Sequence, residues 1–190
     1  MTMIRSLALT LGLLLSGVAA AEDSAPVRVS LDTDRGEILL ELYPDKAPHT
    51  VANFLDYVDR YYYDGLIFHR VVKGFVIQSG GHNFDLSAKE PGEPVVNESA
   101  NGLANRRGTV AMARHADPDS ARSQFYINLA DNANLDPKGD KPGYTVFGKV
   151  IDGMKVVDDI GRSKTRRVDK FDNLPLEPVQ ILRARVVTEP

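Results

Sequence analysis

The chain of 190 residues is 43% hydrophobic and 26% charged, which fits a single globular domain and excludes a disordered or fibrous protein. Its 23 lysines and arginines against 26 aspartates and glutamates give a formal charge of −3, so we expect no nucleic-acid partner, which usually needs a basic face. The chain contains no cysteine, which excludes a thiol nucleophile, disulfide exchange and thiolate metal sites.

The first 21 residues differ in character from the rest of the chain. They carry Arg5 near the start, then about 15 apolar residues, then the small residues Ala19–Ala21. A membrane-spanning helix needs about 20 apolar residues, so this pattern favours a cleavable secretory signal peptide over an anchor. We expect residues 1–21 to be removed, leaving residues 22–190 as an exported, monomeric domain that is not held in a membrane.

A β-hairpin and a helix are the first elements that the remaining sequence predicts. Apolar and polar residues alternate over 27–43 around a turn at Asp34–Gly36, which is typical of a hairpin. Behind Pro48 the period changes to that of a helix. The expected apolar face of this helix consists of Val51, Phe54, Leu55, Val58 and Tyr62.

The rest of the chain predicts short strands and one more helix. The strand-like runs are 66–72, 75–80, 108–113, 123–129, 144–150 and 178–187. A helix closed by a glycine is expected over 152–161, and polar loops over 80–94, 97–107, 130–143 and 161–177. Many short strands with only two helices favour a closed or nearly closed β-barrel whose open ends the helices cover.

Several classes of catalytic site find no support in the residues. The four histidines lack the spacing of a zinc motif, and His69 fits a hydrogen-bonded histidine of the core. No G-x-S-x-G elbow occurs, no glycine pair opens a helix as a phosphate loop does, and no carboxylate pair stands out. We therefore expect no metal, no cofactor and no covalent or hydrolytic mechanism.

Three polar side chains lie inside strongly apolar strand segments: Arg70, Gln78 and Gln124. Strand alternation places Arg70 on the same face as Phe68, and Gln124 on the same face as Tyr126. A face that combines arginine, glutamine and aromatic rings suits a peptide groove better than a core. From the residues alone, Arg70 could equally belong to a buried ion pair or be an exposed strand residue.

Two longer motifs contain these side chains, FHRVVKGFVIQSG over 68–80 and SQFYI over 123–127, and a third motif, VFGKV over 146–150, follows them. In this order they resemble the motifs of the cyclophilin family of peptidyl-prolyl cis-trans isomerases (EC 5.2.1.8). The resemblance runs from about Val27 to about Val187 and points to the bacterial exported branch of the family. It implies a mainly β fold, a closed eight-stranded antiparallel β-barrel capped by two α-helices, in agreement with the pattern of strands and helices.

The resemblance also implies roles for the matching residues. Arg70 would donate a hydrogen bond to the nitrogen of the twisted prolyl amide, Gln78 would hold the carbonyl side and orient Arg70, and Phe75 completes the catalytic set. The pocket for the proline ring would consist of Phe75, Val76, Tyr126 and Leu135. Further substrate contacts are expected from Phe68, Ala113, Arg114, Gln124 and Tyr144.

The chain departs from the common family pattern at several of these positions. Tyr126 is phenylalanine in many members, and its added hydroxyl must find a hydrogen-bond partner or cost free energy. Tyr144 stands where many eukaryotic members have a histidine, Val76 where methionine is frequent and Arg114 where asparagine is frequent. These changes concern substrate preference, and they leave the three expected catalytic residues intact.

We therefore expect a prolyl isomerase, or rotamase, that assists the folding of exported proteins in the periplasm, its partners being proline-containing unfolded or partly folded polypeptides. An alternative is a chaperone module that holds proline-containing segments with little or no turnover. Retention of Arg70 favours the enzyme, because holding a ring needs only the apolar pocket. A third alternative, a structural component of the cell envelope, has only the basic stretch 164–175 in its favour, for which a solvated loop is the simpler interpretation.

Overall fold

The computed structural model of the chain describes residues 26–187. The expected signal peptide, residues 1–21, lies outside the described residues, as do both ends of the expected mature domain. Within the described part, no helix is both long and apolar enough to cross a membrane.

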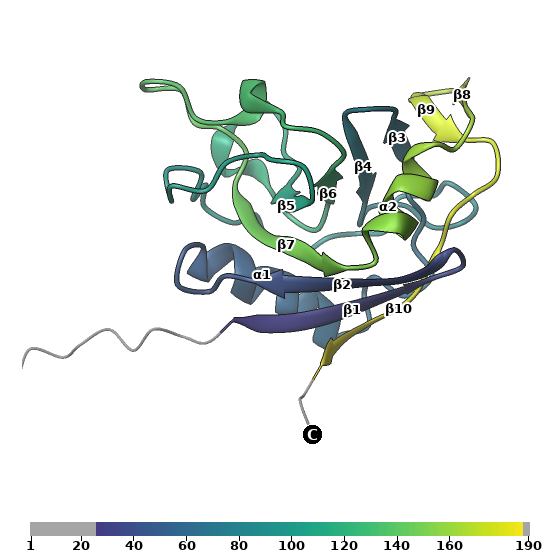
Figure 1. The fold of residues 1–190 in the computed structure, drawn as a ribbon, viewed down its shortest axis with the longest axis horizontal. Coiled ribbons are helices and arrows are strands. Elements are labelled where there is room, and N and C mark those ends of the chain that lie inside the picture. Colours follow the sequence, from purple (N-terminus) through teal and green to yellow (C-terminus); the bar gives the residue numbers. More distant parts are fainter. Residues whose placement is uncertain (1–25, 188–190) are drawn as a thin grey trace, which may run out of the picture.

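Ten strands and two α-helices follow one another in the described part of the chain (Figure 1). The first half contains β1 (Val27–Thr33), β2 (Gly36–Leu42), α1 (Pro48–Asp59), β3 (Arg70–Val72), β4 (Val76–Ser79) and β5 (Thr109–Met112). The second half contains β6 (Phe125–Asn128), β7 (Val146–Asp152), α2 (Met154–Gly161), β8 (Thr165–Val168), β9 (Phe171–Pro175) and β10 (Ile181–Val187). The expected hairpin and both expected helices are thus confirmed.

Eight of the strands form one antiparallel sheet in the order β10-β1-β2-β7-β5-β6-β4-β3. Figure 1 shows this sheet curled, with β1, β2 and β10 on one side and β3 and β4 on the other. Backbone bonds join its two ends, because Phe68 N–H donates to Val179 O at 2.8 Å and Ile181 N–H donates to Leu66 O at 2.8 Å. The expected eight-stranded antiparallel architecture is confirmed, and a short ladder ahead of β3 and β10 closes it.

The interior of the curled sheet is filled by side chains that alternate along the strands. In the first hairpin, Val29 faces Leu40 and Leu31 faces Ile38, and all four are fully buried. Period-2 alternation therefore sends one set of residues into the core and the other to the outer face. At the turn, Gly36 takes a φ of +127°, a conformation that favours glycine.

Helix α1 covers the core with an aromatic side chain. The Phe54 ring lies 5.0 Å from the Tyr63 ring, 5.4 Å from the Phe125 ring and 5.2 Å from the Phe147 ring, measured between centroids. The first turn is capped from a distant loop, since the Glu98 carboxylate accepts the backbone N–H of Thr50 at 2.8 Å. A carboxylate at this end also complements the helix dipole.

The stretch 161–177, which we expected to be a loop, instead contains the β8–β9 hairpin beside β3. That prediction was wrong because β8 is polar and mostly exposed on both faces, so its sequence shows no alternation. The hairpin is held by pairing of Arg166 with Leu174 and by burial of Leu174 and Pro175 at its base. The sequence likewise overestimated the length of β3, which begins only at Arg70.

Candidate active site

One row of residues crosses five neighbouring strands on the outer face of the sheet. Arg70 pairs with Gln78, Gln78 with Tyr126, Tyr126 with Ala111, and Ala111 with Val146. Directly opposed residues of antiparallel strands project to the same face, so the register alone gathers these side chains. Ala111, Tyr126 and Val146 belong to a small apolar cluster of buried residues that is separate from the main core.

The hairpin that joins β3 to β4 places a cation beside an aromatic ring. Its turn is Lys73–Phe75, with Gly74 at a φ of +69°, and Val72 O accepts the Phe75 N–H at 2.9 Å. As a result the Arg70 guanidinium carbon lies 5.9 Å from the centroid of the Phe75 ring. Contacts of this kind are favourable for arginine and hold its planar head in one orientation.

Two amide side chains connect Arg70 to the neighbouring strand. Arg70 Nη1 donates to Gln78 Oε1 at 3.2 Å, and Gln78 Nε2 donates to Gln124 Oε1 at 2.8 Å. Gln78 thus uses its carbonyl oxygen toward Arg70 and its amide group toward Gln124. The chain of bonds fixes the guanidinium while leaving its other N–H groups available for a ligand.

A pocket of about 250 Å³, the Arg70 pocket, opens above this row. Its lining consists of Arg70, Phe75, Val76, Gln78, Ala113, Arg114, Tyr126, Leu135 and Tyr144. The structure therefore brings together nine of the eleven expected site residues, although they lie as far apart in the chain as Arg70 and Tyr144. Six of these nine residues are aliphatic or aromatic, and Arg70, Gln78 and Arg114 bring polar atoms to the lining.

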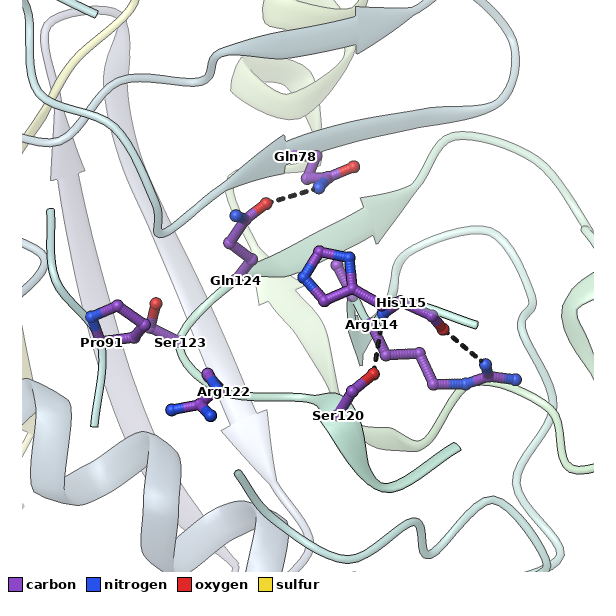
Figure 2. Close-up of a pocket in the computed structure, with 9 residues that line it drawn as sticks. Gln78, Pro91, Arg114, His115, Ser120, Arg122, Ser123 and Gln124 are labelled. Atoms are coloured by element: carbon purple, nitrogen blue, oxygen red, sulfur yellow. Dashed lines mark hydrogen bonds between the residues drawn. The ribbon is translucent and has the colours of Figure 1, made fainter. Parts of the chain in front are cut away.

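A second pocket of about 240 Å³, the Gln124 pocket, continues the first (Figure 2). Gln78, Ala113 and Arg114 line both pockets, and Gln124, the tenth proposed residue, lines the second one together with Ser123. Figure 2 shows the Gln78–Gln124 bond at the junction. The two pockets form one groove, long enough for a peptide to extend beyond a single bound residue.

Phe68 is the eleventh proposed residue, and the prediction that it contacts the substrate is wrong. Its side chain is fully buried in the main core and lines neither pocket. Residues 66–68 belong to the ladder that closes the barrel, ahead of β3, so the strand alternation that relates Phe68 to Arg70 does not carry through. Phe68 supports the site from within the core and has no surface for a substrate.

Arg114 holds the far wall of the Arg70 pocket. Its guanidinium carbon lies 4.6 Å from the centroid of the Tyr144 ring, and Nη2 donates to Pro142 O at 3.0 Å and to Gly143 O at 3.2 Å. The Tyr144 ring in turn meets Tyr126 edge-on with centroids 6.0 Å apart. The side chain of Arg114 thus positions the loop that carries Tyr144.

The hydroxyl of Tyr126 finds the partner that its burial requires. It donates to Asn105 Oδ1 at 2.7 Å, and Asn105 Nδ2 donates onward to Asp136 Oδ1 at 2.9 Å. Burial raises the pKa of Tyr126 strongly, so the hydroxyl stays a neutral donor. The sequence does not single out Asn105, because it lies in a loop and only the folded chain brings it to the Tyr126 hydroxyl.

We expect Tyr126→Phe to lower the free energy of unfolding by about 1 kcal/mol, because Asn105 Oδ1 loses its shortest hydrogen bond while the ring remains. Asn128 Nδ2 still donates to the same oxygen at 3.3 Å, which limits the loss. Urea denaturation measures the change. Tyr144→Phe is the matched control, since no hydrogen bond of the Tyr144 hydroxyl occurs within residues 26–187, and equal stabilities of the two variants would contradict the prediction.

His69 is buried as expected, but its Nδ1 has no hydrogen-bond partner in the described structure. Burial, together with the neighbouring His82 and Arg70 charges, lowers the pKa of His69 to about 3 from 6.5. Between those two values the unfolded chain binds a proton at this residue and the folded protein does not. The contribution of His69 to the free energy of unfolding is therefore fully present above about pH 6.5 and is lost as the pH falls toward 3.

We expect the free energy of unfolding to decrease by about 2 kcal/mol between pH 7 and pH 5 through His69. Urea denaturation at pH 5, 6 and 7 measures the slope, in a range above the titration of most carboxylates. His69→Gln removes this part of the slope, whereas His49→Gln, which changes an exposed histidine at the start of α1, leaves it unchanged. The same slope in wild type and His69→Gln would contradict the assignment.

Comparison with known proteins gives one consistent result. The family model described as cyclophilin type peptidyl-prolyl cis-trans isomerase/CLD matches residues 28–186. Peptidyl-prolyl cis-trans isomerase A of Dickeya dadantii is 48% identical over 84% of this chain and 84% of its own length. Peptidyl-prolyl cis-trans isomerase B of Escherichia coli is 45% identical over 85% of this chain and 99% of its own.

Solved structures agree with these sequence relatives. A cyclophilin type peptidyl-prolyl cis-trans isomerase of Cryptosporidium parvum superposes with a TM-score of 0.73 at 27% identity, covering 87% of this chain and 99% of its own. A crystal structure of the same protein in the presence of the dipeptide Ala-Pro gives a TM-score of 0.71 at 27% identity, covering 85% and 99%.

Proposed function

Because the chain belongs to the cyclophilin-type peptidyl-prolyl cis-trans isomerases, we propose that its groove rotates Xaa-Pro bonds during the folding of exported proteins, with Arg70 as the catalytic donor. The isomerase activity (EC 5.2.1.8) and the binding of proline-containing peptides follow from the family and from the identities of 45–48% to curated isomerases. The proposal adds how the residues of this chain act and where the protein works.

Rotation about a prolyl amide needs no bond to the enzyme. Its barrier of about 18–20 kcal/mol reflects the loss of amide resonance, and the uncatalysed reaction takes tens to hundreds of seconds. An enzyme needs only to bind the twisted amide more tightly than the planar one. In the twisted state the prolyl nitrogen regains a lone pair and becomes a better hydrogen-bond acceptor.

Arg70 is suited to recognise that lone pair. Its guanidinium stays charged, is planar, and is fixed from two sides by Gln78 and the Phe75 ring. A donor held in place before the reaction does not have to reorganise when the acceptor develops. The observation that carries the proposal is this anchored guanidinium in the lining of a pocket that also contains the apolar side chains expected to hold a proline ring.

The apolar walls fit the other half of the substrate. Phe75, Val76, Tyr126 and Leu135 surround the space into which a proline ring would enter, and Gln78 beside them offers its amide group to the carbonyl side. A ring held by these side chains keeps the amide nitrogen near Arg70 while the preceding residue turns. Ala113 and Arg114, which line both pockets, contact the residue before the proline.

Export to the periplasm is supported by residues 1–21, whose charged start, apolar run and small residues fit a signal peptide. The full chain produced in a Gram-negative host is expected in the periplasmic fraction, with a mass that lacks about 21 residues. A chain without residues 2–21 is expected in the cytoplasmic fraction with unchanged isomerase activity. An uncleaved full chain in the cytoplasm would contradict the proposal on location and leave the activity untouched.

A further inference from the structure

A third cavity, the His82 pocket, has a volume of about 540 Å³ and lies between the substrate groove and the β8–β9 hairpin. His69 and His82 form its inner wall, with ring centroids 4.5 Å apart. Phe171 of β9 meets His82 edge-on, with centroids 4.9 Å apart. The hairpin that the sequence presented as a basic loop is therefore one wall of a cavity.

Two residues in the wall of this cavity carry unpaired polar atoms. Within residues 26–187, two buried side-chain nitrogen or oxygen atoms lack a hydrogen-bond partner, namely Nδ1 of His69 and Nδ1 of His82. Both residues line the same pocket and are only 5% and 8% exposed. Buried polar groups in folded proteins are nearly always paired, so these two covered nitrogens in the wall of one cavity would gain a partner if a polar ligand atom reached them.

The charges around the cavity are mainly positive. Arg70, Lys89 and Lys170 line it, against Asp172 as the one acidic residue of the lining. Asp172 is engaged by Arg167 outside the lining, at 3.3 Å from its Nε to the carboxylate. Because burial and the Lys170 charge lower the pKa of His82, the histidines add little charge near neutral pH, and the lysines and Arg70 set the sign of the field.

The His82 pocket is continuous with the substrate groove. Gln124, Ser123, Pro91 and His115, all labelled in Figure 2, line both the Gln124 pocket and the His82 pocket. Arg70 lines both the Arg70 pocket and the His82 pocket. A peptide that runs through the groove therefore passes the mouth of the cavity within a few residues of the bound proline.

We propose that the His82 pocket binds an acidic side chain, aspartate or glutamate, of the polypeptide whose proline occupies the Arg70 pocket. This rests on the proposed function, because it takes the occupant to be part of the same substrate. A carboxylate is attracted by Lys89 and Lys170 and accepts a hydrogen bond from an imidazole N–H of the inner wall. A metal ion fits less well, since no group of three or more histidines, aspartates and glutamates suited to a metal occurs within residues 26–187.

The test compares two series of peptides around one Ala-Pro bond. In the first, glutamate replaces a neutral residue at each position from two to four residues before and after the proline, and in the second, glutamine stands at the same positions. We expect glutamate to lower KM about fivefold relative to glutamine at one position, with little change in kcat. The ratio should decrease toward one as salt is raised, since salt screens partly exposed charges.

Two charge-reversal variants locate the effect. Lys170→Glu is expected to remove the preference for glutamate, whereas Lys155→Glu, an equal change of charge at an exposed position of α2, keeps it. Histidine side-chain NMR provides a second readout, in which binding of the glutamate peptide shifts the ring nitrogens of His69 and His82 and binding of the glutamine peptide does not.

Equal KM values for glutamate and glutamine at every position would overturn the proposal, as would an equal loss of preference in both lysine variants. Unchanged histidine signals with the preferred peptide would overturn it as well. A neutral peptide separates these results from a failure of the proposed function. If the wild-type protein accelerates isomerisation of the neutral peptide, the active site functions and only the acidic subsite is refuted.

Discussion

Replacing Arg70 with alanine is expected to lower kcat/KM for a short Ala-Pro peptide by about 100-fold to 1,000-fold, the usual effect of removing one preorganised donor to the transition state. The apolar walls remain, so the variant still binds the peptide with similar affinity. Exchange NMR measures both quantities in one sample, the rate from the exchange of the cis and trans signals and the affinity from their shifts. Arg70→Lys is expected to recover little activity, because an ammonium group lacks the planar fork that Gln78 and Phe75 hold.

The control for Arg70→Ala is Arg60→Ala, which removes an exposed arginine that pairs with Asp56 on α1. This variant should retain wild-type kcat/KM, since Arg60 lines neither pocket of the groove. If Arg70→Ala retained the full rate, Arg70 would not be the catalytic donor. If the wild-type protein and Arg70→Ala bound the peptide equally and neither accelerated exchange, the chain would be a holding module that keeps the groove without its chemistry.

Replacing Phe54 with alanine is expected to lower the free energy of unfolding by about 3–5 kcal/mol, the usual cost of removing a fully buried phenylalanine. Phe54 has no exposed surface and its ring contacts the rings of Tyr63, Phe125 and Phe147. Its loss leaves a cavity between α1 and strands β6 and β7, which the surrounding rings fill only in part. Urea denaturation followed by tyrosine fluorescence measures the change.

Phe84→Ala is the matched control for Phe54→Ala, because the same atoms are removed from a side chain that is 61% exposed. Its effect should lie within about 0.5 kcal/mol, as for most surface substitutions. A similar loss in both variants would show that α1 is not packed as the structure has it. At temperatures where Phe54→Ala remains folded, its groove keeps its register and we expect near-normal activity.

We expect Arg70→Ala to affect activity and Phe54→Ala to affect stability, because the active site and the core occupy opposite faces of the same strands. On β6, Phe125 and Ile127 point into the main core, while Tyr126 points into the outer cluster beneath the Arg70 pocket. The core fixes the register of β3, β4 and β6, and the register places Arg70, Gln78 and Tyr126 in one row. Substitutions in the outer cluster can therefore change substrate preference with modest effects on stability.

Local patterns in the sequence were sufficient for most of the secondary structure, and the family resemblance of its motifs supplied the site residues. Alternation predicted the hairpin over 27–43, and a helical period predicted α1 and α2, because these periods follow directly from backbone geometry. The resemblance to the cyclophilin family, carried by the motifs around Arg70, Gln124 and Val146, identified ten residues that the folded chain brings to the groove. The expectation that the Tyr126 hydroxyl needs a partner was also available from the residue type alone, although the partner was not.

Tertiary structure decided what depends on contacts between distant segments. Phe68 and Arg70 share strand parity in the sequence, yet closure of the barrel through residues 66–68 puts Phe68 in the core and leaves Arg70 at the groove. The β8–β9 hairpin has no alternation to reveal it, and only its docking beside β3 encloses the His82 pocket. Sequence periodicity records which residues share a face of one strand, whereas the identity of the inner face and of its partners is set when the two ends of the sheet meet.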